Sequence, residues 1–424
     1  MFLFSFRESR GEIMMIRKDK NDLPMKINFV YTLLAFLIVS CAFEDDNLEN
    51  TITLEDLNLP EGYYNYEAIE IPSFYYSNDF ESAQDFQQAA MDLDNMPTEN
   101  PITNAGATLG RVLFYDENLS SNGRVSCASC HQPNEGFSDD SRTSRGVDGQ
   151  TDRHSMSLAN ARFYSTGKFF WDERASSLEE QVLMPFTDET EMGLTLTELV
   201  DLVDSQNYYA DLFEDAYGAS QVSSEGISNA LAQFIRSMVS VTSPYDIARA
   251  EVNNALEDFP AFTNQENMGK RLFFQERTLT NGNQVSCAAC HVSEAFVGSN
   301  PLLASNNTVA THSGLEDDDD LGVGEVTGSV EDHGKFKVPS LKNIALTAPY
   351  MHDGRFDNLE EVINHYSNGI NDHQNSILVN ANGEVGQFRF SDQERAALIS
   401  FLETLTDTEM LTDEKYSNPF ENVR

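Results

Sequence analysis

The sequence predicts a mostly α-helical protein with two domains related by internal duplication and with long loops between the helices. Its 424 residues are enough for two domains of about 150 residues each. A segment that begins as Gly110-Arg-Val-Leu-Phe-Tyr returns as Gly269-Lys-Arg-Leu-Phe-Phe, and both copies lead to Asn-Gly and then to Val-Ser-Cys. Apolar residues recur at helical spacing in several segments, whereas the alternating pattern of a strand is rare.

The start of the chain is expected to be a targeting segment that is removed from the mature protein. Residues 29–40 carry no charge and follow Lys26, which is the pattern of a signal peptide too short to span a bilayer. The sequence Ile-Val-Ser-Cys41 resembles a bacterial lipobox, in which the cysteine is lipidated and becomes the first residue. Residues 1–40 are then an upstream region and a lipoprotein signal peptide, with Met25 as the true start. The alternative is cleavage elsewhere, with Cys41 a spare thiol.

The charge balance limits the partners of this chain. It has 69 acidic and 27 basic side chains, a formal net charge of −42. Such acidity argues against nucleic acid and anionic surfaces and favours a basic partner. Residues 41–85 are acidic and rich in Asn and Tyr, and we expect them to form an acidic tether. The acidic run from Glu316 to Asp320 is interpreted as solvated surface without a further role.

Two domains follow the tether, and helix signals occur in both. We place the N-terminal domain at residues 86–250 and the C-terminal domain at 251–424. Ser224 precedes an apolar stripe at helical spacing. Capping boxes, in which Ser or Thr is followed three residues later by Glu, predict further helix starts at Thr263 and Ser391. The stripe after Ser224 comprises Ile227, Leu231, Phe234 and Met238.

Each repeat contains the motif Cys-x-x-Cys-His, at residues 127–131 and 287–291. Two thiols at this spacing add to the two vinyl groups of one haem, and the adjacent histidine then lies under the iron as its proximal ligand. The predicted cofactor-binding residues are Cys127, Cys130, His131, Cys287, Cys290 and His291.

The four cysteines allow two other interpretations. Paired Cys-x-x-Cys segments can hold one zinc ion, or each pair can form a redox disulfide. Neither explains why a histidine follows both pairs. We therefore predict two covalent c-type haems in two cytochrome-c-like domains, with His131 and His291 as the iron ligands.

Further motifs in the same order along the chain resemble the bacterial di-haem cytochrome c peroxidase family, including its MauG branch. The likeness extends from about residue 100 to about residue 405. It rests on Phe169 to Ala175 (FFWDERA), Ser177 to Gln181 (SLEEQ), Pro185, Glu191 to Gly193 (EMG) and Phe336 to Gly354 (FKVPSLKNIALTAPYMHDG).

The resemblance implies a division of labour between the two haems. The N-terminal haem would react with hydrogen peroxide, and the C-terminal haem would hold and deliver electrons. Glu191 would move the proton during O–O cleavage, Gln181 and Pro185 would line the distal pocket, and Trp171 would carry charge between the haems. The structural alternatives are that Glu191 caps a helix and that Trp171 fills the domain interface.

The N-terminal haem is predicted to have an open face. Family members that need reductive activation place a distal histidine in the loop after the first motif, but residues 144–149 contain none. The alternative is that His154 swings onto the iron. The resemblance also implies a calcium ion bound by the carbonyls of Thr347 and Pro349, with His154 where the family has an asparagine near that ion.

The distal ligand of the C-terminal haem is predicted to be Tyr366. The resemblance places the methionine of the peroxidases, or the tyrosine of MauG, at this position. Helical spacing turns His365 away from it, although His365, Met351 and His352 stay as candidates. A tyrosinate ligand would stabilise ferric iron and lower the potential. The face that carries the tyrosine comprises Leu359, Val362, Ile363 and Tyr366.

Together these features predict a di-haem c-type peroxidase that reduces hydrogen peroxide to water with electrons from a small redox protein. It would be a periplasmic or outer-membrane lipoprotein on the extracytoplasmic side of a membrane, and the resemblance suggests a homodimer. One alternative is MauG-like oxidative modification of a partner protein. Another is a di-haem electron carrier without peroxide chemistry, in which both irons would be six-coordinate.

Overall fold

The computed structural model describes residues 52–77, 88–299, 308, 310–315 and 319–421, all of which lie in one compact unit that spans residues 50–424. The predicted signal peptide and Cys41 lie outside the described residues. Within the described residues, no helix is both long and apolar enough to cross a bilayer.

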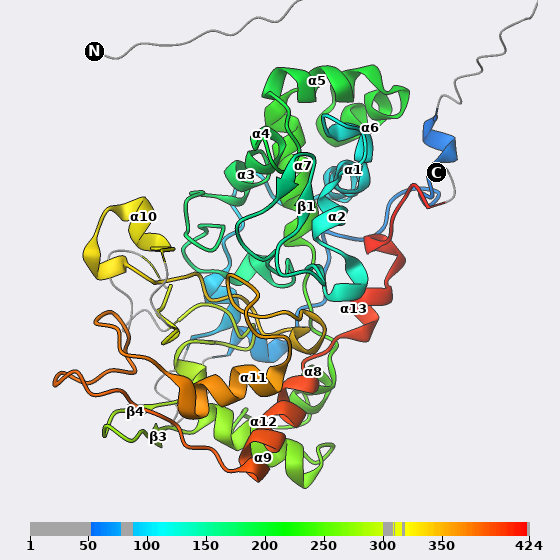
Figure 1. The fold of residues 1–424 in the computed structure, drawn as a ribbon. Helices are drawn as coiled ribbons and strands as arrows, with labels where there is room; N and C mark the ends of the chain where they lie inside the picture. Colours follow the sequence, from blue (N-terminus) through cyan, green and yellow to red (C-terminus); the bar gives the residue numbers. More distant parts are fainter. Residues whose placement is uncertain (1–51, 78–87, 300–307, 309, 316–318, 422–424) are drawn as a thin grey trace, which may run out of the picture. The chain divides into compact units, whose positions relative to one another are not determined.

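Helices make up most of the regular structure, as predicted, and the strands form only two short antiparallel pairs (Figure 1). The first half contains α1 (Asn104–Tyr115), α2 (Cys127–Cys130), α3 (Leu178–Gln181), α4 (Met184–Thr187), α5 (Leu196–Ser205), α6 (Asn207–Tyr217), α7 (Ser224–Arg236) and α8 (Pro244–Arg249). The second half contains α9 (Asn264–Phe274), α10 (Val323–Thr327), α11 (Leu359–Asn364), α12 (Asp392–Glu403) and α13 (Thr408–Thr412). The strands are β1 (Arg145–Gly146) paired with β2 (Gly149–Gln150), and β3 (Arg277–Thr278) paired with β4 (Gln284–Val285).

The predicted helix starts occur in the structure. Thr263 caps α9 and Ser391 caps α12, each with the reciprocal glutamate contact of a capping box. The side chain of Ser223 caps α7 by accepting from the backbone N–H of Gly226, so Ser224 is the first helical residue. The predicted apolar stripe extends beyond this helix, because α7 ends at Arg236 and the last residue of the stripe, Met238, lies buried after the helix end.

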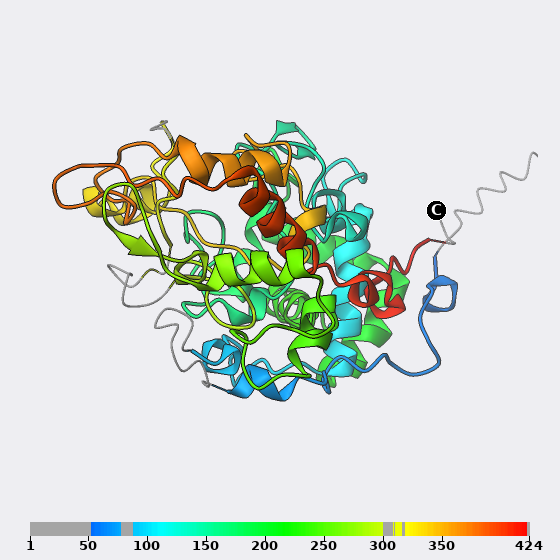
Figure 2. The same ribbon diagram turned by 90° about the horizontal axis from the view of Figure 1, so that it is seen from below.

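The duplicated unit is a pair of crossing helices. In the first copy α1 packs on α7, and in the second α9 packs on α12, as Figures 1 and 2 show. The repeated glycine stands at each crossing. A Cβ atom on Gly110 would lie 2.0 Å from the carbonyl oxygen of Ala230, and one on Gly269 would lie 1.9 Å from that of Ala397. Glycine is therefore needed for the backbones to approach this closely.

Gly269→Ala should consequently lower the free energy of unfolding by about 1–3 kcal/mol, because the added methyl group forces α9 and α12 apart. Chemical denaturation of the haem-loaded protein measures this change. Glu403→Ala on exposed α12 surface is the control, with an expected change of about 0.5 kcal/mol or less. Equal stability of the two variants would contradict the close helix crossing.

Each of the two large hydrophobic cores contains a segment from the other half of the chain. Tyr245 and Ala248 of α8 belong to the second core, whereas Met410, Tyr416 and Phe420 near the C-terminus pack in the first. This C-terminal segment is also held by polar contacts, since the Tyr416 hydroxyl donates to the backbone carbonyl of Ser237. The domain limits 86–250 and 251–424 stay a prediction about the repeated units.

The described part of segment 41–85 is packed rather than extended as a tether. Tyr66 is fully buried in the first core, and its hydroxyl donates to the carbonyl of Lys415 over 2.6 Å. Phe74 and Tyr75 lie in a third cluster with aromatic and aliphatic residues of both halves. Burial of these aromatic side chains corrects the prediction of a solvated tether for residues 52–77.

Candidate haem sites

The first Cys-x-x-Cys-His motif opens onto a cavity of about 840 Å³. The two cysteines begin and end α2, Gln181 ends α3, and Pro185 lies in the first turn of α4. The structure brings all the residues predicted for the reactive haem around this single space. They are Cys127, Cys130, His131, Trp171, Gln181, Pro185 and Glu191.

The tautomer and protonation state of His131 suit a ligand of iron. Its Nδ1 lies 3.1 Å from the carbonyl oxygen of Phe137, which assigns the proton to Nδ1 and leaves Nε2 with a free electron pair. Burial lowers the pKa of the ring, against the opposing effect of the Phe137 carbonyl, so the imidazole is neutral at neutral pH. This is the state that a metal-bound histidine requires.

The cysteines have the properties expected for attachment to haem. None of the four forms a disulfide, and the two pairs line two different cavities, so they form no shared zinc site. Burial raises the pKa of Cys127 and Cys287 to about 12, whereas redox-active and zinc-binding thiols have a lowered pKa. Across residues 52–77, 88–299, 308, 310–315 and 319–421, no group of three or more His, Cys, Asp or Glu is arranged to hold a metal ion.

Glu191 is a half-buried carboxyl on the wall of the first cavity. Burial, assisted by the negative charge of Asp188 and opposed by Arg174, raises its pKa to about 7. Its side chain caps neither neighbouring helix, because Asp188 is the C-cap of α4 and Thr195 is the N-cap of α5. Such a carboxyl can exchange a proton at neutral pH.

The loop without a histidine is fixed beside Glu191. Residues 145–150 form the β1–β2 hairpin, and the backbone N–H of Val147 donates to the carbonyl of Glu191 over 3.0 Å. A Cβ atom on Gly146 would lie only 2.0 Å from the carbonyl oxygen of Thr190. The hairpin thus packs closely against the segment that carries Glu191, and the two residues it adds to the lining of the first cavity, Gly146 and Gln150, include no histidine.

His154, the alternative distal ligand, has both ring nitrogens engaged elsewhere. Nδ1 lies 2.9 Å from the carbonyl oxygen of Ser141, and Nε2 lies 3.1 Å from the hydroxyl of Ser138. The Thr347 carbonyl, one of the two predicted calcium ligands, also acts on this ring. Coordination of iron by His154 would require the loss of at least one of these hydrogen bonds.

The second motif opens onto a separate, mainly apolar cavity of about 220 Å³. Burial lowers the pKa of His291 to about 4, so this imidazole is also neutral. Its Nδ1 is buried and has no hydrogen-bond partner within the described structure. The predicted residues that line this cavity are Cys287, Cys290, His291, Thr347, Pro349, Met351, His352, Leu359, Val362, Ile363 and Tyr366.

Tyr366 faces the cysteines of the second motif. It lies in a π-helical turn, His365–Gly369, that continues α11, and such turns are common at functional sites. Burial, reinforced by nearby Cys290 and Cys287, raises its pKa above the usual range. No hydrogen bond of its hydroxyl group occurs among the described residues. His365 is outside the cavity lining, and its Nε2 lies 3.0 Å from the carbonyl oxygen of Ser313.

The two cavities share a wall that contains Trp171. The indole Nε1–H donates to the carbonyl of His154 over 2.7 Å, and the carbonyl of Trp171 accepts from the backbone N–H of Lys337 over 2.8 Å. The edge of the indole points toward the ring of His352, with 6.5 Å between ring centroids. The residues that line both cavities are His154, Ser155, Met156, Ser157, Trp171 and Lys337.

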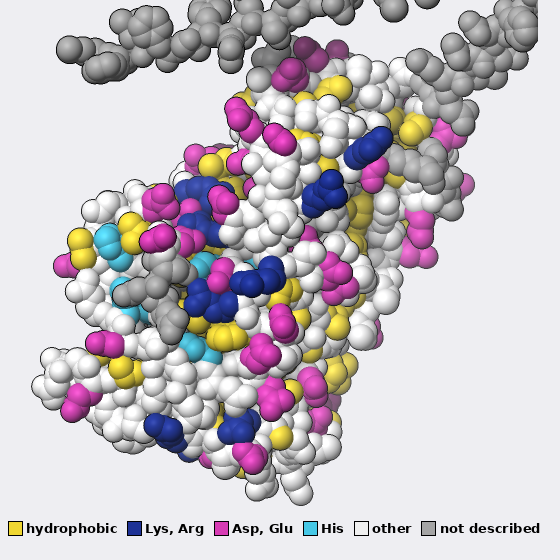
Figure 3. Space-filling view, viewed as in Figure 1, with side chains coloured by type: hydrophobic (Ala, Val, Ile, Leu, Met, Phe, Trp, Pro, Cys, Tyr) yellow, Lys and Arg dark blue, Asp and Glu magenta, His cyan; other side chains and the backbone are white. Residues whose placement is uncertain are grey.

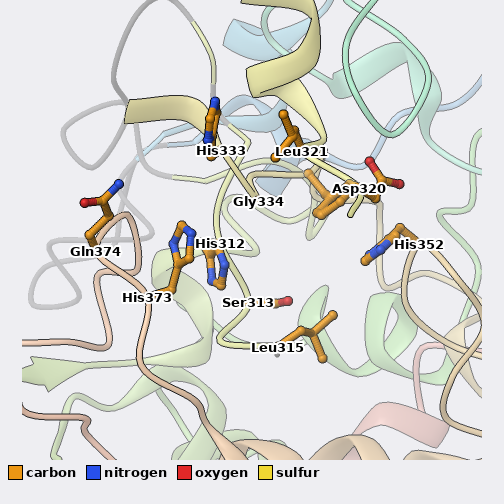
Figure 4. A pocket seen from close by; sticks show the side chains of 11 residues that line it. His312, Ser313, Leu315, Asp320, Leu321, His333, Gly334, His352, His373 and Gln374 are labelled. Atoms are coloured by element: carbon orange, nitrogen blue, oxygen red, sulfur yellow. The ribbon is translucent and has the colours of Figure 1, made fainter. Parts of the chain in front are cut away.

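A third pocket of about 330 Å³, which adjoins the second cavity, has a histidine-rich lining (Figure 4). His312 and His373 stack with 3.8 Å between ring centroids, and His352 lines both spaces. His312, His333 and His373 belong to no local sequence motif and could not be predicted from the sequence. Only the fold brings them together.

The interpretation of the acidic run from Glu316 to Asp320 as solvated surface is wrong for Asp320, which forms an ion pair with Arg153. Its two carboxylate oxygens accept from Nε and Nη2 of Arg153, each over 2.7 Å, and Arg153 also pairs with Asp172 at 2.6 Å. Residues 316–318 lie outside the described part of the chain. On the face in Figure 3, acidic side chains are otherwise widely scattered, which fits the net charge of −42.

Two helix-pair domains, each with a Cys-x-x-Cys-His motif at its own cavity, define the class of di-haem c-type cytochromes. A sequence model of the di-haem cytochrome c peroxidase family matches residues 104–253 and 263–412, and the chain belongs to this family. This match confirms the resemblance seen in the motifs. Family membership implies two c-type haems and an oxidoreductase of the peroxidase type.

Relatives of known function include both branches of the family. The methylamine utilization proteins MauG of Methylophilus methylotrophus and Methylorubrum extorquens are 31% and 33% identical, over 73% of this chain and 84% and 80% of theirs. Cytochrome c551 peroxidase of Nitrosomonas europaea is 31% identical over 71% of this chain and 79% of its own length.

Solved structures show the same fold. A MauG-like protein associated with microbial copper homeostasis has a TM-score of 0.64 at 32% identity, with 77% of this chain and 96% of that chain covered. The diheme peroxidase BthA from Burkholderia thailandensis has a TM-score of 0.57 at 21% identity, with 76% and 91% covered, and this likeness concerns the fold alone.

Proposed function

We propose that this chain reduces hydrogen peroxide to water at the N-terminal haem site, with electrons that arrive through the C-terminal site from a small redox protein. The observation that carries the proposal is Glu191, a half-buried carboxyl with a pKa raised to about 7, on the wall of the cavity that His131 also lines. When bound, a haem supplies the redox chemistry of O–O cleavage. Two electrons and two protons then convert one peroxide molecule into two water molecules.

Glu191 moves the proton. Its carboxylate accepts a proton from one peroxide oxygen and returns it to the other, which leaves as water. A pKa near the working pH keeps both forms of the carboxyl available during this transfer. Gln181 and Pro185 would close the pocket around the peroxide, and the hairpin of residues 145–150 offers no histidine that could occupy the site where peroxide binds.

The second site holds and passes electrons. His291 and, as we propose, Tyr366 would hold the second iron, because both line the second cavity and Tyr366 lies close enough to Cys290 and Cys287 to interact with them electrostatically. The positive charge of ferric iron would remove the phenolic proton that burial otherwise retains. Trp171, in the shared wall, offers an aromatic path between the sites.

A steady-state assay tests this function. Haem-loaded protein with a reduced basic cytochrome or similar donor should consume one peroxide for every two donor electrons. Donor oxidation without peroxide consumption would instead identify a di-haem electron carrier.

Oxidative modification of a partner protein is the second candidate. It is favoured by the MauG relatives, which are as similar to this chain as the peroxidase is, and by Tyr366 at the position of the second distal ligand. This function uses the same peroxide site, but the electrons come from a partner side chain. Mass spectrometry of co-purified proteins after peroxide treatment distinguishes the two, since only the second leaves a covalent change in a partner.

We further propose an extracytoplasmic lipoprotein anchored through Cys41, a calcium ion at the carbonyls of Thr347 and Pro349, and a homodimer. Cys41→Ser should move the haem protein from the membrane fraction to the supernatant, because a lipidated N-terminus is the only anchor assigned. Cell fractionation measures this shift, and retention of the variant in the membrane would contradict the anchor. Calcium removal with a chelator and sedimentation of the holoprotein test the other two points.

A further inference from the structure

Lys337 is a buried cation at the meeting point of the two haem cavities. It lines both of them, and its backbone N–H is bonded to the carbonyl of Trp171. Six residues line both cavities, and Lys337 is the one Lys or Arg among them. The other basic residue, His154, is neutral because burial lowers its pKa. Lys337 is only 5% exposed.

The ammonium group has no oxygen partner within the described structure. Nζ lies 3.3 Å from the thioether sulfur of Met156 and 4.2 Å from the centre of the Tyr164 ring. A thioether is a weak acceptor, and an aromatic face satisfies a cation only in part. The buried carboxylate of Glu173 acts on Lys337 through its charge but is not hydrogen-bonded to Nζ. Its Oε1 accepts from the Tyr164 hydroxyl, and its Oε2, 3.7 Å from Nζ of Lys168, has no hydrogen-bond partner within the described structure.

Other buried lysines of this chain are satisfied by oxygen atoms. Lys342 pairs with Asp246 at 2.5 Å, Lys335 pairs with Asp332 at 3.0 Å, and Lys270 donates to two backbone carbonyls over 2.5 Å. Burial of a charge without a partner is costly, so native proteins avoid it. The position of Lys337 therefore calls for an anion that is supplied by something other than the described chain.

We propose that Lys337 binds the carboxylate of a haem propionate where the two cavities meet. Each c-type haem brings two propionates, and its cysteines hold the opposite, vinyl-bearing part of the ring. The inference rests on the two haems that family membership implies, and not on the reaction with peroxide. A positive charge at this point favours the reduced haem, so Lys337 adjusts the potential beside the Trp171 path.

A redox titration of the haem-loaded protein followed by optical spectroscopy tests the proposal. Lys337→Met should lower the midpoint potential of one haem, since the ferric form loses a destabilising positive charge. The haem that shifts is the one whose propionate is bound, and a shift in either supports the proposal. Lys337→Arg should keep the wild-type potentials.

Unchanged potentials in fully loaded Lys337→Met protein would overturn the proposal. If that variant fails to load both haems, the wild-type protein decides. Burial lowers the pKa of Lys337 to about 8, and the negative charge of Glu173 opposes this effect only in part. A bound propionate should raise the pKa of Lys337 further. The midpoint potentials of both haems should therefore stay constant as the pH is changed through 8. Tyr164, which faces the ammonium group, stays protonated there because burial and Glu173 raise its pKa, and Lys168 lies beyond Glu173. A fall in potential centred near pH 8 would show an unpaired lysine.

Discussion

Glu191→Gln is expected to slow the reaction with hydrogen peroxide by about 10²- to 10⁴-fold, the usual contribution of a general acid–base group. The amide keeps the size of the side chain but can neither accept the peroxide proton nor return it. Haem content and the optical spectrum of the resting protein should not change. Single-turnover mixing of the variant with peroxide measures the rate directly.

Glu189→Gln provides a matched control two residues away. Glu189 is exposed and does not line the first cavity, so its replacement should leave the rate unchanged. An unchanged rate in fully loaded Glu191→Gln protein would remove Glu191 from the mechanism.

The pH profile gives a second readout of the same group. Glu191 must be deprotonated to act as a base, and its pKa is raised to about 7 by burial. The wild-type rate should therefore rise with pH through about 7 and level off above it. Glu191→Gln should lack this rise.

Tyr366→Phe is expected to raise the midpoint potential of the C-terminal haem by on the order of 0.1 V, within the range of about 0.8 V that axial ligands span. A phenolate stabilises ferric iron, and phenylalanine offers no ligand atom in its place. The ferric spectrum should also change, because the iron loses its sixth ligand. Spectroelectrochemistry and electron paramagnetic resonance measure these two effects.

Tyr350→Phe is the matched control for this experiment. Tyr350 also lines the second cavity, but its hydroxyl donates to the carbonyl of Ile344 over 2.9 Å. Loss of this hydrogen bond should lower the free energy of unfolding by about 1 kcal/mol and leave the midpoint potential and the ferric spectrum unchanged. An identical potential and spectrum in fully loaded Tyr366→Phe protein would exclude ligation by Tyr366.

Local sequence patterns were sufficient for part of this account. The attachment cysteines and histidines are adjacent in the chain, and helix caps such as Thr263 depend on side chains three residues apart. The repeated glycine was visible as part of the duplication, but its place at a helix crossing, where close approach leaves no space for a side chain, came only from the structure. Glu191 and Trp171 could be singled out only through the resemblance to a known family, since isolated Glu and Trp residues carry no pattern of their own.

Contacts between distant segments could not be predicted from the sequence. The return of Tyr416 to the first core, the packing of Tyr66 in the supposed tether and the pairing of Asp320 with Arg153 each join residues more than 150 positions apart. The environment of Lys337 could not be predicted for the same reason, because it forms where two cavities meet. A buried lysine and a solvated one look alike in a sequence, and only the fold separates them.

The most direct test of the central claim is a rapid-mixing optical experiment on fully oxidised, haem-loaded protein with one equivalent of hydrogen peroxide. The hairpin of residues 145–150 carries no histidine, and His154 is hydrogen-bonded through both ring nitrogens. The N-terminal iron should therefore be open at rest, and the haem bands should change rapidly on mixing. No change until one haem has first been reduced would contradict the account and would point to His154 as a distal ligand.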